Sequence, residues 1–132
     1  MPSTPLLIYG ANGYTGALIT RLAVARGLRP ILAGRSHAAL AAVAVPLGLE
    51  YRVFALEDTA ALDAALAHVQ VVLHCAGPFA HTARQMVDAC FRTQTHYLDI
   101  TGEIAVFEAL AACDAEARAA GVRVLPGAAR RW

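Results

Sequence analysis

The stretch that most constrains this chain covers residues 6–16, where a short apolar run meets a turn rich in glycine. The run Leu6-Leu7-Ile8-Tyr9 ends at a glycine, which is typical of a buried strand. After the turn, Leu18, Ile19, Leu22 and Ala23 are spaced to share one face of a helix that stops at Gly27. The turn between them reads Gly10-Ala11-Asn12-Gly13-Tyr14-Thr15-Gly16. We therefore predict a strand–turn–helix unit at the start of the chain.

This turn is suited to a phosphate group. Its three glycines let the backbone approach a ligand closely, since no β-carbon stands in the way. The helix behind it directs free amide groups and its positive dipole end into the same space, which favours a pyrophosphate. The spacing is Gly-x-x-Gly-x-x-Gly, and the Gly-Lys-Ser/Thr of ATP- or GTP-hydrolysing phosphate loops is missing. The alternative is a purely structural turn, but the strand–turn–helix context favours dinucleotide binding.

The rest of the chain continues the alternation of strands and helices. Further strands are predicted over residues 30–33, 51–56, 69–76, 96–100 and 122–125. With five helices and short connections, this pattern predicts an α/β fold: a Rossmann-type, doubly wound parallel sheet of six strands in three α/β/α layers. No linker or repeat divides residues 1–132, so we expect a single domain.

Three helices carry specific expectations. Ser36 is a suitable N-cap for the second helix, and Pro46 is expected to end or kink that helix early. A long helix is expected after Gly77-Pro78. The last helix is expected to begin after Glu103 and to continue until Gly121 stops it.

Charge and hydropathy exclude several partners. The net charge is +1, so nothing indicates nucleic acid. The chain is 58% hydrophobic with a mean hydropathy of +0.49, yet no apolar run approaches the roughly 20 residues of a membrane span. The excess of apolar residues is expected to face a partner domain or a second copy of the chain.

Cysteine, histidine and the N-terminus bear on location and metal binding. Cys75, Cys90 and Cys113 form no Cys-x-x-Cys pair, which fits reduced, mostly buried thiols in a cytoplasmic protein. The five histidines show no metal-ligand spacing, so we assign no metal site. The N-terminus lacks the basic region and apolar core of an export signal.

The residues that follow the second strand bear on the choice of cofactor. In a doubly wound sheet the ligand lies across the carboxyl ends of the strands, and an acid after the second strand would bind the ribose of NAD. Here that place holds Gly34-Arg35-Ser36. Arg35 offers a fork of donors suited to a 2′-phosphate, and Ser36 adds a hydroxyl, so we predict NADP over NAD. The alternative is a solvated Arg35 and a Ser36 that only caps the helix.

Other strand ends supply further candidates. Asp58 is suited to accept a hydrogen bond from the adenine amino group, or simply to cap the next helix. Cys75-Ala76-Gly77 are small residues where the central and nicotinamide parts of the cofactor would pass. No neighbour activates Cys75 as a nucleophile. Four polar residues at the fifth strand are either near the substrate or structural, and the catalytic residues stay unassigned: Tyr97, Asp99, Thr101 and Glu103. The chain has no lysine and no Tyr-x-x-x-Lys, which excludes the short-chain dehydrogenase mechanism.

Four stretches, in this order, resemble the NADP-binding domain of the saccharopine dehydrogenase-like family, in particular its trans-acting enoyl reductase branch. They are residues 9–16, Leu32-Ala33-Gly34-Arg35-Ser36, Cys75-Ala76-Gly77-Pro78-Phe79 and residues 97–103. The resemblance implies an NADP(H)-dependent oxidoreductase that acts on a small molecule held largely by a second domain. That C-terminal domain is absent from these residues, so we expect this chain to bind the cofactor without turning over substrate.

Two other functions stay open at this stage. One is a module that binds and senses NADP without catalysis. The other is an S-adenosylmethionine-dependent methyltransferase, which shares the alternating pattern but normally carries an acid after the second strand, where this chain has Arg35.

Overall fold

The chain folds into alternating strands and helices, and the computed structural model describes residues 5–128. The two ends of the expected domain, residues 1–4 and 129–132, lie outside the described residues. The strands are β1 (Leu6–Tyr9), β2 (Ile31–Gly34), β3 (Tyr51–Val53), β4 (Val71–His74), β5 (His96–Asp99) and β6 (Val124–Leu125). The helices are α1 (Tyr14–Ala25), α2 (His37–Leu47), α3 (Thr59–Leu66), α4 (Phe79–Thr93), α5 (Ile104–Ala111) and α6 (Asp114–Ala120).

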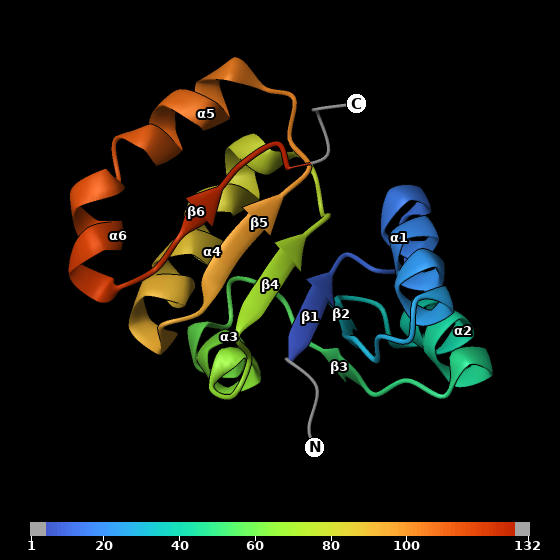
Figure 1. The fold of residues 1–132 in the computed structure, drawn as a ribbon. Coiled ribbons are helices and arrows are strands. Elements are labelled where there is room, and N and C mark those ends of the chain that lie inside the picture. The colour runs from blue at the N-terminus through green and yellow to red at the C-terminus, as the bar shows by residue number, and fades with distance from the viewer. Residues whose placement is uncertain (1–4, 129–132) are drawn as a thin grey trace.

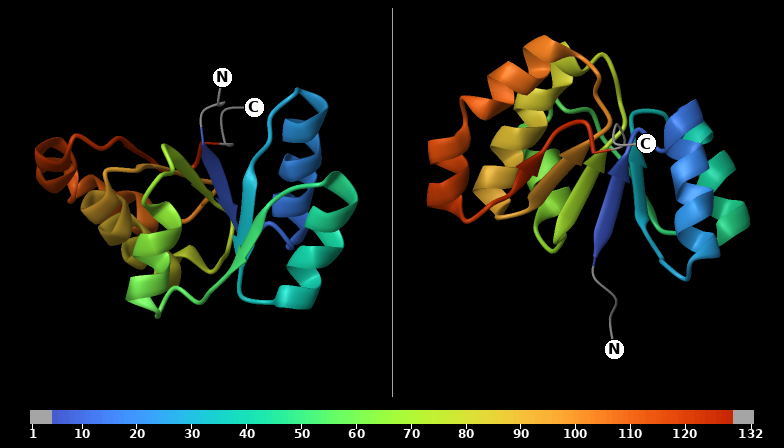
Figure 2. Two further views of the ribbon diagram at one scale, coloured as in Figure 1. Left: turned by 90° about the horizontal axis from the view of Figure 1, so that it is seen from below. Right: turned by 45° about the horizontal axis from the view of Figure 1, so that its top comes forward.

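The strands form one parallel sheet in the order β3-β2-β1-β4-β5-β6 (Figure 1). The chain moves from β1 toward β2 and β3, then returns past β1 to β4, so the strand order reverses between β1 and β4. Helices α1 and α2 lie on one face, whereas α3 to α6 lie on the other (Figure 2). The predicted doubly wound α/β fold is thereby confirmed. Its reversal point leaves a crevice at the carboxyl ends of the strands.

The central strand β1 is buried on both faces, because helices cover it from both sides. Leu7 and Tyr9 join the larger apolar cluster beneath α3 and α4, while Ile8 joins the smaller cluster beneath α1 and α2. All three side chains are at most 2% exposed. A continuous apolar strand is the pattern that a central parallel strand requires.

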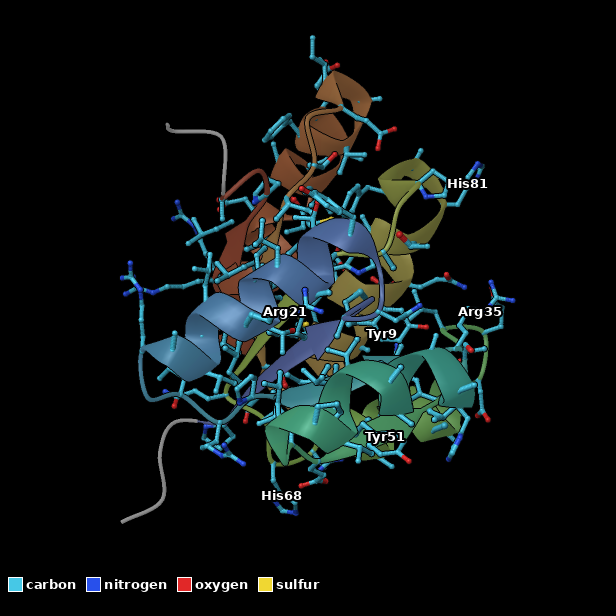
Figure 3. All side chains as sticks on the ribbon, turned by 90° about the vertical axis from the view of Figure 1, so that its right-hand side faces the viewer. Tyr9, Arg21, Arg35, Tyr51, His68 and His81 are labelled. Carbon is cyan, nitrogen blue, oxygen red and sulfur yellow. The ribbon has the colours of Figure 1, made fainter. Side chains whose placement is uncertain are left out.

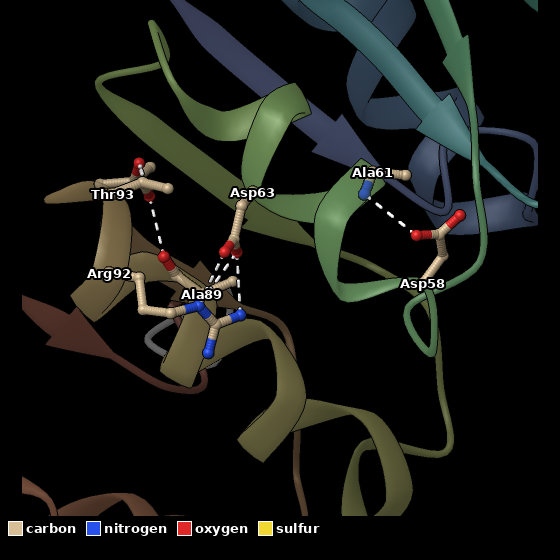
Figure 4. Close-up of polar contacts among 7 residues, drawn as sticks. Asp58, Ala61, Asp63, Ala89, Arg92 and Thr93 are labelled. Atoms are coloured by element: carbon tan, nitrogen blue, oxygen red, sulfur yellow. Dashed lines mark hydrogen bonds and ion pairs between the residues drawn. The ribbon is translucent and has the colours of Figure 1, made fainter.

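Helices α3 and α4 are also joined at the surface. The guanidinium of Arg92 donates three hydrogen bonds to the carboxylate of Asp63, at 3.1, 2.9 and 2.8 Å (Figure 4). Both side chains are partly exposed, so this ion pair contributes at most about 1 kcal/mol. The apolar contacts beneath it hold the two helices together.

One face of the sheet is only half covered. The register places Ile8, Leu73, Leu98 and Leu125 in one row across β1, β4, β5 and β6. Ile8 is fully buried, Leu73 and Leu98 are half-buried, and Leu125 is 55% exposed. Among the described residues, α1 and α2 lie over β1 to β3, and no helix lies over this face of β4 to β6 (Figure 1).

Two helix predictions were wrong. Pro46 does not shorten α2, which continues to Leu47. Pro46 lies in the exposed last turn, where the carbonyl that loses its helix partner can bond to water instead. The expected single helix after Glu103 is broken into α5 and α6, since the amide of Cys113 bonds to the carbonyl of Leu110 and tightens the chain there. The described residues therefore form six helices, not five.

Strand lengths and one helix face also differ from expectation. Strands β3 and β4 are shorter than the predicted 51–56 and 69–76. On α1 the buried positions include Ala17, Thr20 and Ala23, whereas Leu18 and Leu22 are 46% and 52% exposed. Small side chains let α1 lie close to the sheet, so its larger ones are left outside.

Candidate functional site

A pocket of about 310 Å³ opens at the carboxyl ends of β1, β2 and β4, in the crevice where the strand order reverses. Three loops line it, and each directly follows one of these strands. Its lining residues are Tyr9, Gly10, Asn12, Gly13, Gly34, Arg35, Ser36, Cys75, Ala76 and Gly77. Segments far apart in the sequence therefore meet in one cavity.

The glycine turn forms the first wall of the pocket. Gly10 has a φ of +81°, which side chains other than glycine rarely adopt. A β-carbon on Gly10 would also lie 2.8 Å from the backbone nitrogen of Ala76, so the turn and the loop after β4 approach closely only with glycine here. The amide of Gly10 donates to the carbonyl of Ala33 at 2.8 Å, which fixes the turn to β2.

Helix α1 begins at this wall. Gly13 is its N-cap and supplies no side chain to bond the first amides. The first helix bond runs from the amide of Ala17 to the carbonyl of Gly13 at 2.9 Å, so the preceding amides have no acceptor within the helix. No acidic residue lies in the first turn. An anion at this end would meet amide donors and the positive end of the helix dipole.

The loop after β2 forms the second wall. Arg35 is exposed, extends from the molecule in Figure 3, and makes no ion pair within residues 5–128. Its guanidinium is thus available to an anion. Ser36 caps α2, since its hydroxyl accepts a hydrogen bond from the amide of Ala39 at 3.3 Å. Ser36 therefore lines the pocket and caps a helix at once.

The loop after β4 forms the third wall. It presents the backbone of Ala76 and Gly77 and the half-buried thiol of Cys75. Burial and the nearby Asp99 raise the pKa of the Cys75 thiol to about 12. This thiol is therefore protonated at neutral pH, and a thiolate nucleophile is disfavoured.

Five residues predicted to bind the cofactor do not line the pocket. Within the glycine turn, Ala11 and Gly16 are buried, whereas Thr15 is exposed and Tyr14 is 89% exposed. Asp58 lies after β3, where its carboxylate accepts a hydrogen bond from the amide of Ala61 at 3.1 Å (Figure 4). The structure thus gives Asp58 its alternative role, the N-cap of α3.

The polar residues at the end of β5 form a buried network. The hydroxyl of Tyr97 donates to the Asp99 carboxylate at 2.6 Å, and the amides of Thr101 and Gly127 donate to it at 3.0 and 2.7 Å. Tyr97, Asp99 and Thr101 are fully buried, while Glu103 is exposed. Burial and the bond to Asp99 raise the pKa of the Tyr97 phenol. This network anchors the chain after β6 to the end of β5.

Sequence reasoning did not select two of the lining residues, Tyr9 and Gly34. Both are the last residues of their strands, so the rule that ligands lie at carboxyl ends of strands would have found them. The hydroxyl of Tyr9 donates to the carbonyl of Phe54 at 3.1 Å, and burial raises its pKa to about 12. Tyr9 is therefore a packed, neutral wall of the pocket.

Residues 5–128 contain neither a candidate metal site nor a candidate membrane-spanning helix. No group of three or more His, Cys, Asp or Glu side chains is arranged to hold a metal ion. None of the helices in this part of the chain is both long and apolar enough to cross a membrane.

Curated relatives align with most of this chain. A trans-acting enoyl reductase of Mycobacterium leprae is 36% identical over 106 residues, which is 75% of this chain and 25% of that protein. The protein of the same name from Mycobacterium tuberculosis is 34% identical over 106 residues, again 25% of its length. This chain thus spans about a quarter of the length of the curated relatives that it matches.

Solved structures share the fold. The apo saccharopine dehydrogenase (L-Glu forming) of Saccharomyces cerevisiae superposes with a TM-score of 0.78 at 25% identity, over 96% of this chain and 27% of that one. The triphenylmethane reductase of Citrobacter sp., solved with NADP(H), gives 0.68 at 18% identity over 88% of this chain and 46% of its own. The family model described as the saccharopine dehydrogenase NADP binding domain matches residues 6–125. The chain therefore belongs to the saccharopine dehydrogenase NADP-binding domain family.

Proposed function

We propose that the chain binds NADP(H) in the pocket between the loops after β1, β2 and β4, and holds it for hydride transfer to or from a small molecule. One observation carries this proposal. The pocket joins a glycine turn, the start of α1 and the exposed cation of Arg35 at the point where the strand order reverses. That combination suits a dinucleotide with an additional phosphate.

Each wall of the pocket suits a different part of the cofactor. The pyrophosphate lies at the glycine turn and the start of α1, where free amides and the helix dipole attract it. The 2′-phosphate of the adenosine lies beside Arg35 and Ser36, which offer a guanidinium and a hydroxyl. The nicotinamide half then passes the small residues Cys75, Ala76 and Gly77.

This chain on its own is expected to bind the cofactor but not to turn over substrate. Among the described lining residues, the hydroxyl of Tyr9 is bonded to a backbone carbonyl and the thiol of Cys75 is protonated. Neither is a ready acid or base at neutral pH. The matched region makes up only 25% of the relative named trans-acting enoyl reductase, which supports a substrate-binding region elsewhere in the whole reductase.

The sheet face of β4 to β6 that no described helix covers also needs a partner. Leu73, Leu98 and Leu125 form an apolar surface, the half-uncovered row on β4 to β6. Further chain of a longer reductase is the occupant that the relatives' length supports. A second copy of this chain would instead appear as a dimer in light scattering, and Leu98→Asp would dissociate it.

The three free cysteines support a reducing, cytoplasmic location.

Calorimetric titration of the purified chain with NADPH, NADH and S-adenosylmethionine tests the proposal. We expect saturable binding of NADPH, weaker binding of NADH and no binding of S-adenosylmethionine. Absence of NADPH binding by the folded chain would overturn the proposal. Folding is checked in the same sample by circular dichroism.

A further inference from the structure

The last residue of β4 is a buried histidine, His74, whose side chain makes one hydrogen bond within the described part of the chain. The Nε2 atom of His74 lies 2.8 Å from the hydroxyl of Thr82, which stands in the first turns of α4. The Thr82 hydroxyl also lies 3.0 Å from the carbonyl oxygen of Ala76 and 3.3 Å from that of Pro78. One threonine thus connects the end of β4 to both sides of the loop that follows it.

Hydrogen-bond chemistry assigns the protons in this group. A hydroxyl has a single hydrogen, and carbonyl oxygens only accept, so Thr82 donates toward Ala76 and Pro78. Thr82 must then accept from His74, which places the imidazole hydrogen on Nε2. The opposite nitrogen, Nδ1, is left as a bare acceptor, and it is buried without a hydrogen-bond partner among residues 5–128.

The surroundings of His74 do not explain why the position is polar. Its ring packs against the rings of Tyr9, Phe79 and Tyr97, with centroids 6.0, 5.1 and 6.1 Å away, and the residue is fully buried. An apolar side chain would fill this space without leaving a buried acceptor unpaired. What the imidazole adds is the hydrogen bond to Thr82.

That bond bears directly on the width of the pocket. Ala76, whose carbonyl Thr82 holds, is a lining residue and packs against Gly10 of the glycine turn. The space beside Gly10 is so limited that a single β-carbon there would meet the Ala76 backbone at 2.8 Å. Movement of Ala76 therefore changes the separation between the first and third walls of the pocket.

We infer that His74 and Thr82 form a positioning pair, which sets the backbone of Ala76 and Gly77 for the nicotinamide half of NADP(H). This inference rests on the proposed cofactor site. The pair does not reach the wall formed by Arg35 and Ser36, so it acts on one half of the cofactor only.

Two ligands separate this role from a general effect on folding. NADPH extends over all three walls, whereas 2′,5′-ADP carries only the adenosine half and its phosphates. Thr82→Val keeps the shape of the side chain but removes the hydroxyl. We expect it to weaken NADPH binding about tenfold, which corresponds to about 1.4 kcal/mol. Binding of 2′,5′-ADP should stay within about twofold of the parent.

A control and a rescue complete the experiment. Thr93→Val is the matched control, because Thr93 lies at the other end of α4 and its hydroxyl bonds to Ala89 and Thr95 (Figure 4). It should leave both affinities unchanged. Thr82→Ser keeps the hydroxyl and should restore NADPH binding.

The outcomes are distinguishable. If Thr82→Val binds NADPH as the parent does, or loses both ligands equally, the positioning role is wrong. If the folded parent binds neither ligand, the proposed cofactor site itself fails. Thermal unfolding of each variant shows whether a loss reflects the fold instead.

Discussion

The side-chain oxygen of Asn12 occupies the space beside Gly34, where a β-carbon on residue 34 would lie only 2.9 Å away from it. Both residues line the pocket, from the first and second walls. Gly34→Ala would therefore push the Asn12 side chain out of its position, while the backbone has no need to move. We expect a folded protein that binds NADPH several-fold more weakly, measured by calorimetry.

The double substitution tests this coupling. In an Asn12→Ala background the extra methyl group meets only the methyl groups of Leu40, at an ordinary contact distance of 3.5 Å, so Gly34→Ala should cost less affinity than in the parent. Equal losses in the two backgrounds would mean that Gly34 acts independently of Asn12.

A second prediction concerns the glycine turn. Gly13→Val places a branched side chain in the pocket, at the N-cap of α1, where the pyrophosphate should lie. A β-carbon on Gly13 would have only the carbonyl oxygen of Gly10 nearby, at 3.5 Å, so the fold should tolerate the change. We expect NADPH binding to be abolished while the circular dichroism spectrum is kept. An affinity within about twofold of the parent would place the site elsewhere.

The sequence predicted the sheet well because most strands are short apolar runs between clear breaks. The predictions were wrong for features that depend on contacts between distant segments. The break between α5 and α6 falls in an alanine-rich stretch without glycine or proline, at Cys113, whose thiol accepts a hydrogen bond from Arg84 on α4. Similarly, the exposure of Leu18 and Leu22 depends on how closely α1 approaches the sheet. Neither relation is visible in local spacing.

The pocket was predictable in outline for a related reason. In a parallel sheet the carboxyl ends of all strands meet at one edge, so glycine, arginine and small residues after β1, β2 and β4 had to converge. Asp58 follows the same rule, but it lies outside this pocket and caps α3, because its own helix begins at once. Its contact with the adenine amino group stays a prediction. The link from His74 to Thr82 was hidden, since eight residues and a change of secondary structure separate them.

A third prediction concerns cofactor choice. A guanidinium can make two charge-assisted hydrogen bonds to a 2′-phosphate, whereas NADH offers only a hydroxyl at that place. Arg35 is exposed, so solvent screens part of this gain. We expect the parent to prefer NADPH by on the order of 10²-fold, less at high salt. Arg35→Asp should reverse the order, because its carboxylate repels the phosphate and accepts from the ribose hydroxyls.

Calorimetric titration with both cofactors at two ionic strengths measures this preference. Arg123→Asp is the matched control, since it changes the net charge equally but lies before β6, at the opposite edge of the sheet. It should keep the preference of the parent. Equal affinity of the parent for NADH and NADPH would show that Arg35 is only a solvated surface residue.

The last prediction concerns stability against pH and depends on His74. Burial lowers the pKa of His74 from 6.5 to about 4 in the folded protein. The unfolded chain therefore binds a proton at a higher pH than the folded one. The contribution of the neutral His74 to the free energy of unfolding is fully present above pH 6.5, and it falls as the pH falls toward 4. At 1.36 kcal/mol per pKa unit, the loss reaches about 3 kcal/mol.

Urea unfolding of the parent and of His74→Gln across this range measures the effect. Other groups also titrate at these pH values, namely the carboxylates, but they are common to both proteins and cancel in the difference. The titratable groups that surround His74 are Tyr9 on β1 and Tyr97 and Asp99 on β5, and the two phenols stay neutral here because burial raises their pKa. Glutamine does not titrate. Between neutral pH and pH 4, the unfolding free energy of the parent should therefore fall by about 3 kcal/mol more than that of His74→Gln. His68→Gln, at an exposed histidine labelled in Figure 3, controls for the substitution and should follow the parent. Parallel curves for the parent and His74→Gln would mean that His74 is not held neutral by burial.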